Sequence, residues 1–402
     1  MRTFVSLFSG AGGLDLGLEQ AGWDCLFATD NEPNAIATLE ANRGYQVGLG
    51  RTFLDGAQVH LADIRQLSGQ DVLSRIGLGK GEVPLLAGGP PCQSWSSGGL
   101  QKGFDDPRGQ LVEQYLRIAS AIEPRWLIFE NVRGLLTARG RDGVPGSALA
   151  AIRTDLFERG WQSKVALINA ADFGISQRRV RLILVGYRAG DEPDFPSPSH
   201  GLHADGARNG WTSLGKCIGE IAPVSAAEII RPSGKLADNL KDVVPGSGVK
   251  SPGKREATRP GGHWGYKQGA FVADLNRPAR TVTASSQQDW IIDPVLGLRR
   301  LCPRECAAIQ TFPATWQFVG NLAAQYRLIG NAVPPQLGEV LGNALGSALE
   351  RRTTSETGPS SLMPLPQALQ SAITYTMREE RRNGPSRRAA GQRRKPLKEV
   401  TG

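Results

Sequence analysis

The stretch that decides the fold is FVSLFSGAGGLDLGLEQAG, residues 4–22, where an apolar run passes through a glycine-rich turn into a helical pattern. Gly10, Gly12 and Gly13 occupy the turn, and their lack of a Cβ atom lets the backbone approach a ligand closely. Gly22 follows the helical pattern and suits the end of a helix. The stretch predicts a strand, a tight turn and a helix in succession.

The same alternation continues through the first 190 residues and predicts βαβ units around a parallel sheet. The expected strands cover residues 3–8, 24–29, 59–62, 83–87, 125–129, 164–169 and 181–187. The expected helices lie around residues 14–20, 33–42, 110–122 and 147–158, with later ones around 303–311 and 335–350. In such a sheet, ligands bind just past the carboxyl ends of the strands.

Two carboxylates follow the second and third expected strands and suggest a nucleoside site. Asp30 ends the second strand, in the position where a carboxylate accepts hydrogen bonds from ribose hydroxyls. Asp63 follows the third strand and could accept a bond from an adenine amino group. Because Gly12 and Gly13 are adjacent and no glycine lies three residues after Gly12, the turn departs from a dinucleotide fingerprint. A ligand without a pyrophosphate is favoured over NAD, and a tight turn without any ligand is the alternative for this motif alone.

A second motif, VPLLAGGPPCQSWSSGG at residues 83–99, places Cys92 after the fourth expected strand. Pro90 and Pro91 prevent a smooth continuation into helix and hold the thiol in a rigid presentation. A buried structural cysteine is the competing interpretation, since most free cysteines are small core residues. A Pro-Pro corner before a Ser/Gly-rich segment is a poor place for core packing, so we interpret Cys92 as a candidate nucleophile.

A carboxyl group and two guanidinium groups follow the thiol along the chain. Glu130 ends the fifth expected strand, where it can act as a proton donor or, alternatively, as an ordinary acid at a strand-helix junction. In SQRRVRLILVG, residues 176–186, strand alternation places Gln177, Arg179 and Arg181 on one face. Two guanidiniums on one face can hold a carbonyl, phosphate or carboxylate oxygen, whereas an isolated motif of this kind would more often be a solvated basic edge.

Together these segments resemble the cytosine-5 DNA methyltransferase family. Six segments match that family's sequence blocks in the family's order, over about residues 1–190 and 275–350: FSGAGG (8–13), GGPPCQSWS (88–96), ENVRG (130–134), QRRVR (177–181), RPARTVT (277–283) and GNAVPP (330–335). The resemblance implies a Rossmann-like α/β sheet that binds S-adenosylmethionine, and a second, smaller, loop-rich target recognition domain.

The resemblance also implies roles for individual residues. Cys92 would attack carbon 6 of cytosine, Glu130 would protonate ring nitrogen 3, and Arg181, supported by Arg179, would hold the cytosine carbonyl oxygen. The base would be rotated out of the duplex, under a loop formed by residues 93–108. The cofactor residues implied by the resemblance are Phe8, Gly10, Gly12, Gly13, Leu14, Asp30, Asn31, Asp63, Ile64 and Asn331.

The expected organisation has four parts: a catalytic domain over 1–189, a target recognition domain over 190–276, a return to the catalytic domain over 277–350, and a tail over 351–402. The net charge is +9, and +7 of it lies in the tail, which has eleven Lys/Arg and four Glu. The tail is rich in Pro, Ser and Arg and lacks a sustained apolar stripe, so we expect it to be largely disordered. It could be a solubilising terminus or an arm that binds phosphates nonspecifically.

The five cysteines are scattered and odd in number, which argues against a disulfide framework and for a reducing, cytoplasmic setting. No metal-ligand spacing is convincing and no stretch is apolar enough to span a membrane. We therefore expect a monomeric bacterial modification enzyme acting on double-stranded DNA, with a companion restriction endonuclease as a possible partner. Three alternatives stay open: a tRNA methyltransferase on this scaffold, a noncatalytic DNA-binding protein, and an NAD-dependent dehydrogenase.

Overall fold

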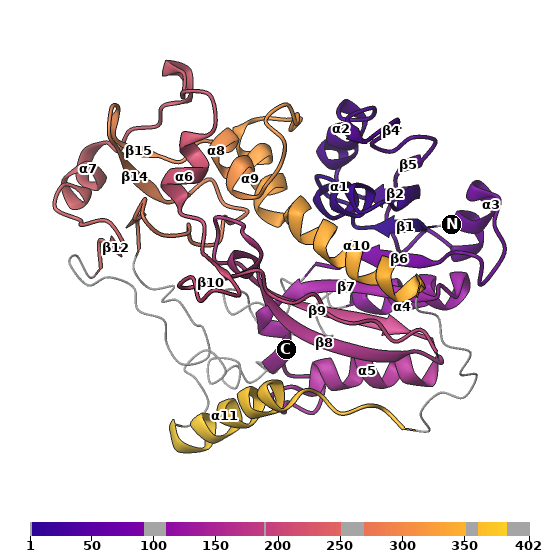
Figure 1. Ribbon diagram of the computed structural model, residues 1–402. Coiled ribbons are helices and arrows are strands. Elements are labelled where there is room, and N and C mark those ends of the chain that lie inside the picture. Colours follow the sequence, from indigo (N-terminus) through magenta and orange to yellow (C-terminus); the bar gives the residue numbers. More distant parts are fainter. Residues whose placement is uncertain (1, 92–109, 189, 251–268, 351–360, 384–402) are drawn as a thin grey trace, which may run out of the picture.

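The computed structural model describes residues 2–91, 110–188, 190–250, 269–350 and 361–383. Its centre is a seven-stranded sheet with the strand order β5-β2-β1-β6-β7-β9-β8 (Figure 1). The strands of this sheet are β1 (Thr3–Leu7), β2 (Asp24–Asp30), β5 (Gln58–Leu61), β6 (Leu85–Gly88), β7 (Trp126–Val132), β8 (Gln162–Asn169) and β9 (Val180–Tyr187). All seven strands expected from the sequence are confirmed, with ends that shift by at most three residues.

The direction of one strand differs from the expectation of an all-parallel sheet. Strand β9 runs antiparallel to both of its neighbours, β7 and β8. The cause is the short connection between β8 and β9, which contains the single-turn 3-10 helix η3 (Ala170–Phe173) and no crossover helix. A parallel pair needs a longer crossover connection, so this link can only return the chain in the opposite direction.

Helices cover both faces of the sheet. One apolar cluster joins the sheet to α1 (Gly13–Gln20), α2 (Pro33–Ala41) and α10 (Pro335–Glu350). A second cluster on the opposite face joins it to α3 (Gly69–Ile76), α4 (Gln110–Ile122), η2 (Arg133–Thr137) and α5 (Ser147–Glu158). Residues of β1 alternate between the two clusters, as expected for a strand buried on both faces: Phe4 belongs to the first, and Val5 to the second. Within the described residues, no helix is long and apolar enough to cross a membrane.

Helix α10 packs unusually closely against α1. A Cβ atom on Gly17 would lie 2.1 Å from the carbonyl oxygen of Pro335, and one on Gly13 would lie 2.1 Å from that of Val333. Only glycine permits such contact between backbones. The segment that ends at Pro335 is therefore fixed against the glycine-rich turn, although more than 300 residues separate them in sequence.

A smaller region lies beside the sheet (Figure 1). It contains β10 (His200–Gly201), β11 (Asn209–Gly210), α6 (Leu214–Gly219), η4 (Ala226–Glu228), α7 (Gly234–Leu240), β12 (Ser247–Gly248), β13 (Phe271–Val272), β14 (Trp290–Asp293), β15 (Gly297–Arg300), α8 (Pro303–Ile309) and α9 (Leu322–Asn331). A four-stranded sheet of order β12-β13-β14-β15 has a small core that includes Leu240, Val272 and Trp290. Because this sheet takes strands from both sides of residue 276, the smaller region continues beyond the expected boundary there.

The expectation of a largely disordered tail is wrong for residues 361–383. Helix α11 (Gln367–Asn383) packs its residues Leu369, Ala372 and Ile373 against the cluster that contains η2 and α5. The segment before this helix, residues 361–366, contacts β8: Gln162 Nε2 donates to the carbonyl oxygen of Ser361 at 3.0 Å. The sequence shows only a short apolar stripe here, which is insufficient for an isolated helix but sufficient for one that docks on a core.

We expect Leu369→Ala to lower the free energy of unfolding by about 2–4 kcal/mol, because the Leu369 side chain is 7% exposed and its loss leaves a cavity. The exposed neighbour Ser371 offers a control, and Ser371→Ala should change stability by less than about 0.5 kcal/mol. Urea unfolding of both variants measures the difference. Equal midpoints would show that α11 does not pack on the body of the protein.

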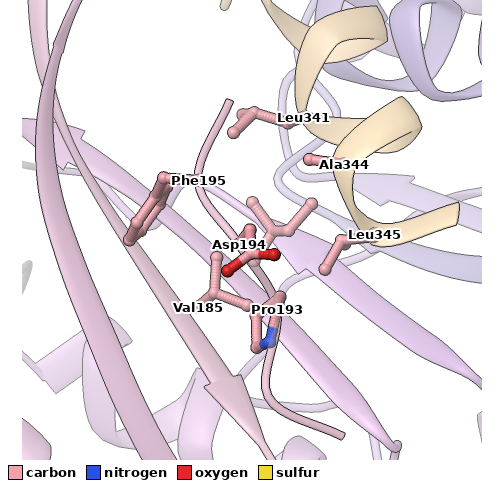
Figure 2. Close-up of a pocket in the computed structure, with 8 residues that line it drawn as sticks. Val185, Pro193, Asp194, Phe195, Leu341, Ala344 and Leu345 are labelled. Atoms are coloured by element: carbon pink, nitrogen blue, oxygen red, sulfur yellow. The ribbon is translucent and has the colours of Figure 1, made fainter. Parts of the chain in front are cut away.

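A small pocket lies under α10, lined by residues from β7, β9, α10 and the segment 193–195 (Figure 2). Its lining is apolar apart from Asp194, with Val185, Phe195 and Leu341 among the contributors. The pocket lacks the convergent polar groups that mark a ligand site. We interpret it as a packing gap between α10 and the sheet.

Candidate active site and relatives

The strand order places a topological switch point at β1. From β1 the chain moves outward through β2 to β5 and then returns to the other side of β1 as β6. The connections that follow β1 and β6 therefore leave the same sheet edge in diverging directions. Open α/β sheets bind ligands in the crevice at such a point. The glycine-rich turn follows β1 and the Pro-Pro segment follows β6, so both sequence motifs lie there.

The backbone of the turn after β1 takes up left-handed conformations. The φ angles are 59° at Phe8, 56° at Gly10 and 78° at Gly12. Such an angle is costly for a bulky residue like Phe8, and strain of this kind occurs mostly at functional sites. Apart from Gly10 and its two chain neighbours, no heavy atom of the described residues lies within 4 Å of the position that a Cβ on Gly10 would occupy. The turn thus leaves open space beside Gly10 for a ligand to approach the backbone.

The Asp30 carboxylate connects two loops at this edge. Its Oδ2 accepts from the Gly10 backbone N–H at 2.9 Å, and its Oδ1 accepts from that of Glu32 at 2.9 Å. Burial raises the pKa of Asp30 and these backbone bonds oppose the rise. Each oxygen has further acceptor capacity, so Asp30 can hold the turn and still receive ribose hydroxyls. Asn31 is exposed beside it.

The remaining predicted cofactor residues lie around the same edge. Leu61 of β5 pairs with Asp30 of β2, which places Asp63 two residues beyond the pair. The Asp63 carboxylate is held by Arg65, whose Nε lies 3.0 Å from each carboxylate oxygen, and this contact lowers the pKa of Asp63. An adenine amino group would have to share these oxygens with Arg65. Ile64 is buried, at 5% exposure.

Asn331, expected near the amino-acid end of the cofactor, is exposed at the last residue of α9. The segment after it reaches the glycine-rich turn, since Val333 contacts Gly13 as described above. Gly330, just before it, approaches the backbone of Thr283 so closely that a Cβ would lie 2.1 Å from the Thr283 carbonyl oxygen. The blocks RPARTVT and GNAVPP therefore meet in space.

Glu130 and Arg181 form an ion pair at the end of β7. The Arg181 Nε lies 2.9 Å from the Glu130 Oε1, and each side chain is 12% exposed. The antiparallel register brings them together: Val132 pairs with Arg181, so the beginning of β9 lies opposite the end of β7. The guanidinium fixes the position of the carboxyl group and leaves Oε2 outside this contact.

The segment that leads to Cys92 is fixed beside the ion pair. Asn131 Nδ2 donates to the carbonyl oxygen of Pro90 at 3.2 Å. A Cβ on Gly89 would lie 2.9 Å from the Glu130 Oε2, so only glycine fits between β6 and this carboxyl group. Sequence reasoning overlooked both residues, although Asn131 stands next to Glu130. Cys92 itself and residues 93–108 lie outside the described residues.

Arg179 and Gln177 belong to a buried network rather than to a simple strand face. Arg179 is 1% exposed, and its guanidinium donates to the carbonyl oxygens of Val282, Gly330 and Ala332 at 2.9–3.1 Å. The Gln177 Nε2 donates to the Oε1 of Gln310 at 2.7 Å. The Arg179 contacts join the segment that leads into β9 to the blocks RPARTVT and GNAVPP. Gln310 had no signal in the sequence, because its partners are distant along the chain.

Comparison with known proteins agrees with this arrangement. The family model described as C-5 cytosine-specific DNA methylase matches residues 2–347. Type II methyltransferase M1.HphI from Haemophilus parahaemolyticus is 33% identical over 352 residues, which cover 85% of this chain and 86% of the relative. Type II methyltransferase M.Eco47II from Escherichia coli is 32% identical over 377 residues, 87% of this chain and 80% of the relative.

Solved structures show the same fold. A putative DNA modification methyltransferase from an Escherichia coli prophage has a TM-score of 0.60 at 19% identity, covering 87% of this chain and 100% of that chain. A methyltransferase from Entamoeba histolytica has a TM-score of 0.60 at 16% identity, covering 87% and 99%. Since the family model spans the sheet, the smaller region and the Glu130–Arg181 pair, the chain belongs to the C-5 cytosine-specific DNA methylase family and is a DNA (cytosine-5) methyltransferase.

Proposed function

We propose that this enzyme transfers a methyl group from S-adenosylmethionine to carbon 5 of a cytosine in a specific DNA sequence, through a transient bond between the cytosine and Cys92. The observation that carries the proposal is the Glu130–Arg181 pair beside the anchored Pro90 segment, at the same sheet edge as the glycine-rich turn. A proton donor, an oxygen-binding guanidinium and a nucleophile loop would thus converge next to the cofactor site.

The residues of the turn fit S-adenosylmethionine. The open space at Gly10, the left-handed Phe8 and the spare acceptor capacity of Asp30 suit a nucleoside with no pyrophosphate. Gly12, Gly13 and Leu14 would complete the turn, with Asn31 at the ribose, Asp63 and Ile64 at adenine, and Asn331 at the amino-acid end. When bound, the cofactor supplies a methyl group activated by its positively charged sulfur. Because these residues match the family's blocks, we assign the cofactor to this edge.

We propose Cys92 as the nucleophile, because the thiols of the other four cysteines are unsuited to this role. Burial raises the pKa of the thiols of Cys25, Cys217 and Cys306, and raises that of Cys302 to about 12. A buried thiol with a raised pKa supplies little thiolate, the reactive form. In the sequence Cys92 follows Pro90 by two residues, and Pro90 is anchored by the neighbour of Glu130, Asn131.

The chain's own residues would act on the cytosine ring in sequence. Carbon 5 of cytosine is a poor nucleophile, and addition of the Cys92 thiolate to carbon 6 gives it enamine character. Glu130 would donate a proton to ring nitrogen 3 as negative charge develops, and Arg181 would hold the carbonyl oxygen, with Arg179 fixing the surrounding backbone. After methyl transfer, loss of the carbon-5 proton would expel the thiol and restore the ring.

This chemistry requires a base outside the helical stack. Rotation of the cytosine out of the duplex costs about a few kcal/mol.

We assign sequence recognition to the smaller region. The sequence of this region offers Trp211, His263, Trp264 and Lys267 as possible base-reading residues. Trp211 donates its indole N–H to Asp172 Oδ1 at 2.9 Å, which favours a structural role for that side of the ring. His263, Trp264 and Lys267 lie outside the described residues. We further propose a monomer that protects DNA in a restriction-modification system, since several relatives carry the name Type II methyltransferase.

Methyl transfer is tested by incubating the protein with duplex DNA and S-adenosylmethionine labelled in the methyl group. The expected product is label in 5-methylcytosine, and bisulfite sequencing of DNA from an expressing host should reveal one recurrent sequence context. A parallel reaction with tRNA separates the alternative substrate. Label in adenine, or in RNA alone, would overturn the proposal.

A further inference from the structure

Arg133 occupies a constrained position next to the catalytic groups. It is the first residue of η2 and follows β7 directly, three residues after Glu130. Leu135 and Leu136, with exposures of 0% and 1%, anchor η2 in the core. Helix α11 packs on the same element (Figure 1). The backbone that carries Arg133 is therefore held at the sheet edge where the cytosine must enter.

Within the part of the chain that the structure describes, the Arg133 guanidinium makes no hydrogen bond or ion pair, which sets it apart. Among the arginines that the structure describes and that are buried or half-buried, every other one makes a hydrogen bond or an ion pair within the chain. The pairs Arg125–Asp191, just before β7, and Arg181–Glu130, between β9 and β7, are two examples. Several of these arginines, such as Arg117 and Arg188, bond to backbone carbonyl oxygens and not to a described carboxylate, but each has such a partner. Within the described residues, Arg133 is the half-buried arginine whose guanidinium has neither a counterion nor a hydrogen-bond acceptor.

Half-burial of an unpaired guanidinium is costly. Loss of water lowers the pKa of Arg133 below its usual value, and a charge taken from water is normally compensated by an opposite charge. An arginine is also the side chain best suited to hold a phosphate, through two parallel N–H donors. The substrate of this enzyme family is a polyanion that must reach the edge carrying Glu130. A phosphate of the substrate can therefore supply the partner that this guanidinium lacks among the described residues.

We propose that Arg133 binds a backbone phosphate of the DNA strand that carries the target cytosine, close to the extruded nucleotide. The contact deepens the function proposed above, since it rests on DNA reaching this edge. It would fix the register of the flipped nucleotide over Glu130 without reading its base, because phosphate contacts position a protein and carry no sequence information themselves.

The test compares duplex binding by the wild type, Arg133→Gln and Arg133→Lys, on the duplex whose modification bisulfite sequencing has identified. Arg133→Gln should weaken binding about tenfold and lower the slope of log affinity against log salt by about 0.9. Arg133→Lys should keep the slope and recover part of the affinity, because it keeps the charge but loses the two-pronged geometry. Arg141→Gln is the matched control. The Arg141 side chain is 79% exposed, and its contact with Glu113 is long, at 3.9 Å. Removal of the Arg141 charge should therefore leave the affinity for DNA within twofold.

A scan with single methylphosphonates, which neutralise one phosphate at a time, locates the contact. The wild type should lose affinity strongly at one position flanking the target cytosine, and Arg133→Gln should show no further loss there. If Arg133→Gln folds poorly, Arg133→Met gives the same comparison, because methionine keeps an apolar stem for the half-buried position and removes the charge.

Wild-type affinity and salt slope in Arg133→Gln would overturn the proposal. Weaker binding of S-adenosylmethionine with unchanged DNA binding would also overturn it, and would assign the guanidinium to the cofactor carboxylate. Methylation of cytosine by the wild type, measured in the same samples, tests the proposed function separately.

Discussion

Cys92→Ser should abolish methyl transfer, with a fall in kcat of at least about 10³-fold, equivalent to about 4 kcal/mol of transition-state stabilisation. A serine hydroxyl is far less ionised and less nucleophilic than a thiol, so it cannot add to carbon 6 at a useful rate. Affinity for DNA and for S-adenosylmethionine should change little, because the substitution removes only a step of bond formation. Single-turnover kinetics with labelled cofactor, together with equilibrium binding, separate the two effects.

A trapping experiment tests the bond itself. An oligonucleotide with 5-fluorocytosine at the target position has no carbon-5 proton to lose, so the wild type should remain attached to it through denaturation, and Cys92→Ser should not. Cys217→Ser serves as the control, because burial raises the pKa of the Cys217 thiol and its loss should leave trapping intact. Near wild-type turnover by Cys92→Ser would refute the covalent mechanism.

Glu130→Gln should lower kcat by about 10²–10⁴-fold, the range expected when a proton donor in the transition state is lost. The amide retains the size of the side chain and an oxygen that can accept from Arg181 Nε, now 2.9 Å from the carboxylate. The fold and the Michaelis constant for DNA should therefore be largely preserved. Steady-state kinetics that resolve kcat from KM provide the measurement.

Glu113→Gln is a matched control for this substitution. The Glu113 side chain is 50% exposed on α4, and its contact with Arg141 is 3.9 Å long, so its loss should leave kcat within twofold. If Glu130→Gln retained full kcat, the proton at ring nitrogen 3 would have to come from another group.

Local patterns in the sequence were sufficient to predict the strand and the helix that flank the glycine-rich turn. The run from an apolar strand through Gly10, Gly12 and Gly13 into α1 requires no distant partner to be recognised, since glycine is the residue that tolerates those backbone angles. The same holds for β6 and its Pro-Pro exit. Positions of strand ends were predictable because burial on both faces makes the strands continuously apolar.

The tail shows where local pattern is misleading. Residues 367–383 have a low share of apolar side chains, and composition alone favoured disorder. Leu369 and Ile373 nevertheless find an apolar surface on η2 and α5, with Ile373 seated against Gly146. The stability of such a helix comes from the surface it covers, which the sequence of the helix does not contain.

By itself the sequence determined the kinds of residue that the site uses and the strand ends on which they stand: a thiol after β6, a carboxyl on β7 and a guanidinium on β9. Only the tertiary structure decided that Arg181 meets Glu130 while Arg179 holds the backbone of Gly330 and Ala332. The reason is that β9 runs antiparallel to β7, which brings the start of one strand to the end of the other. Strand direction and register depend on hydrogen bonds between segments about fifty residues apart, and no local pattern of side chains specifies them.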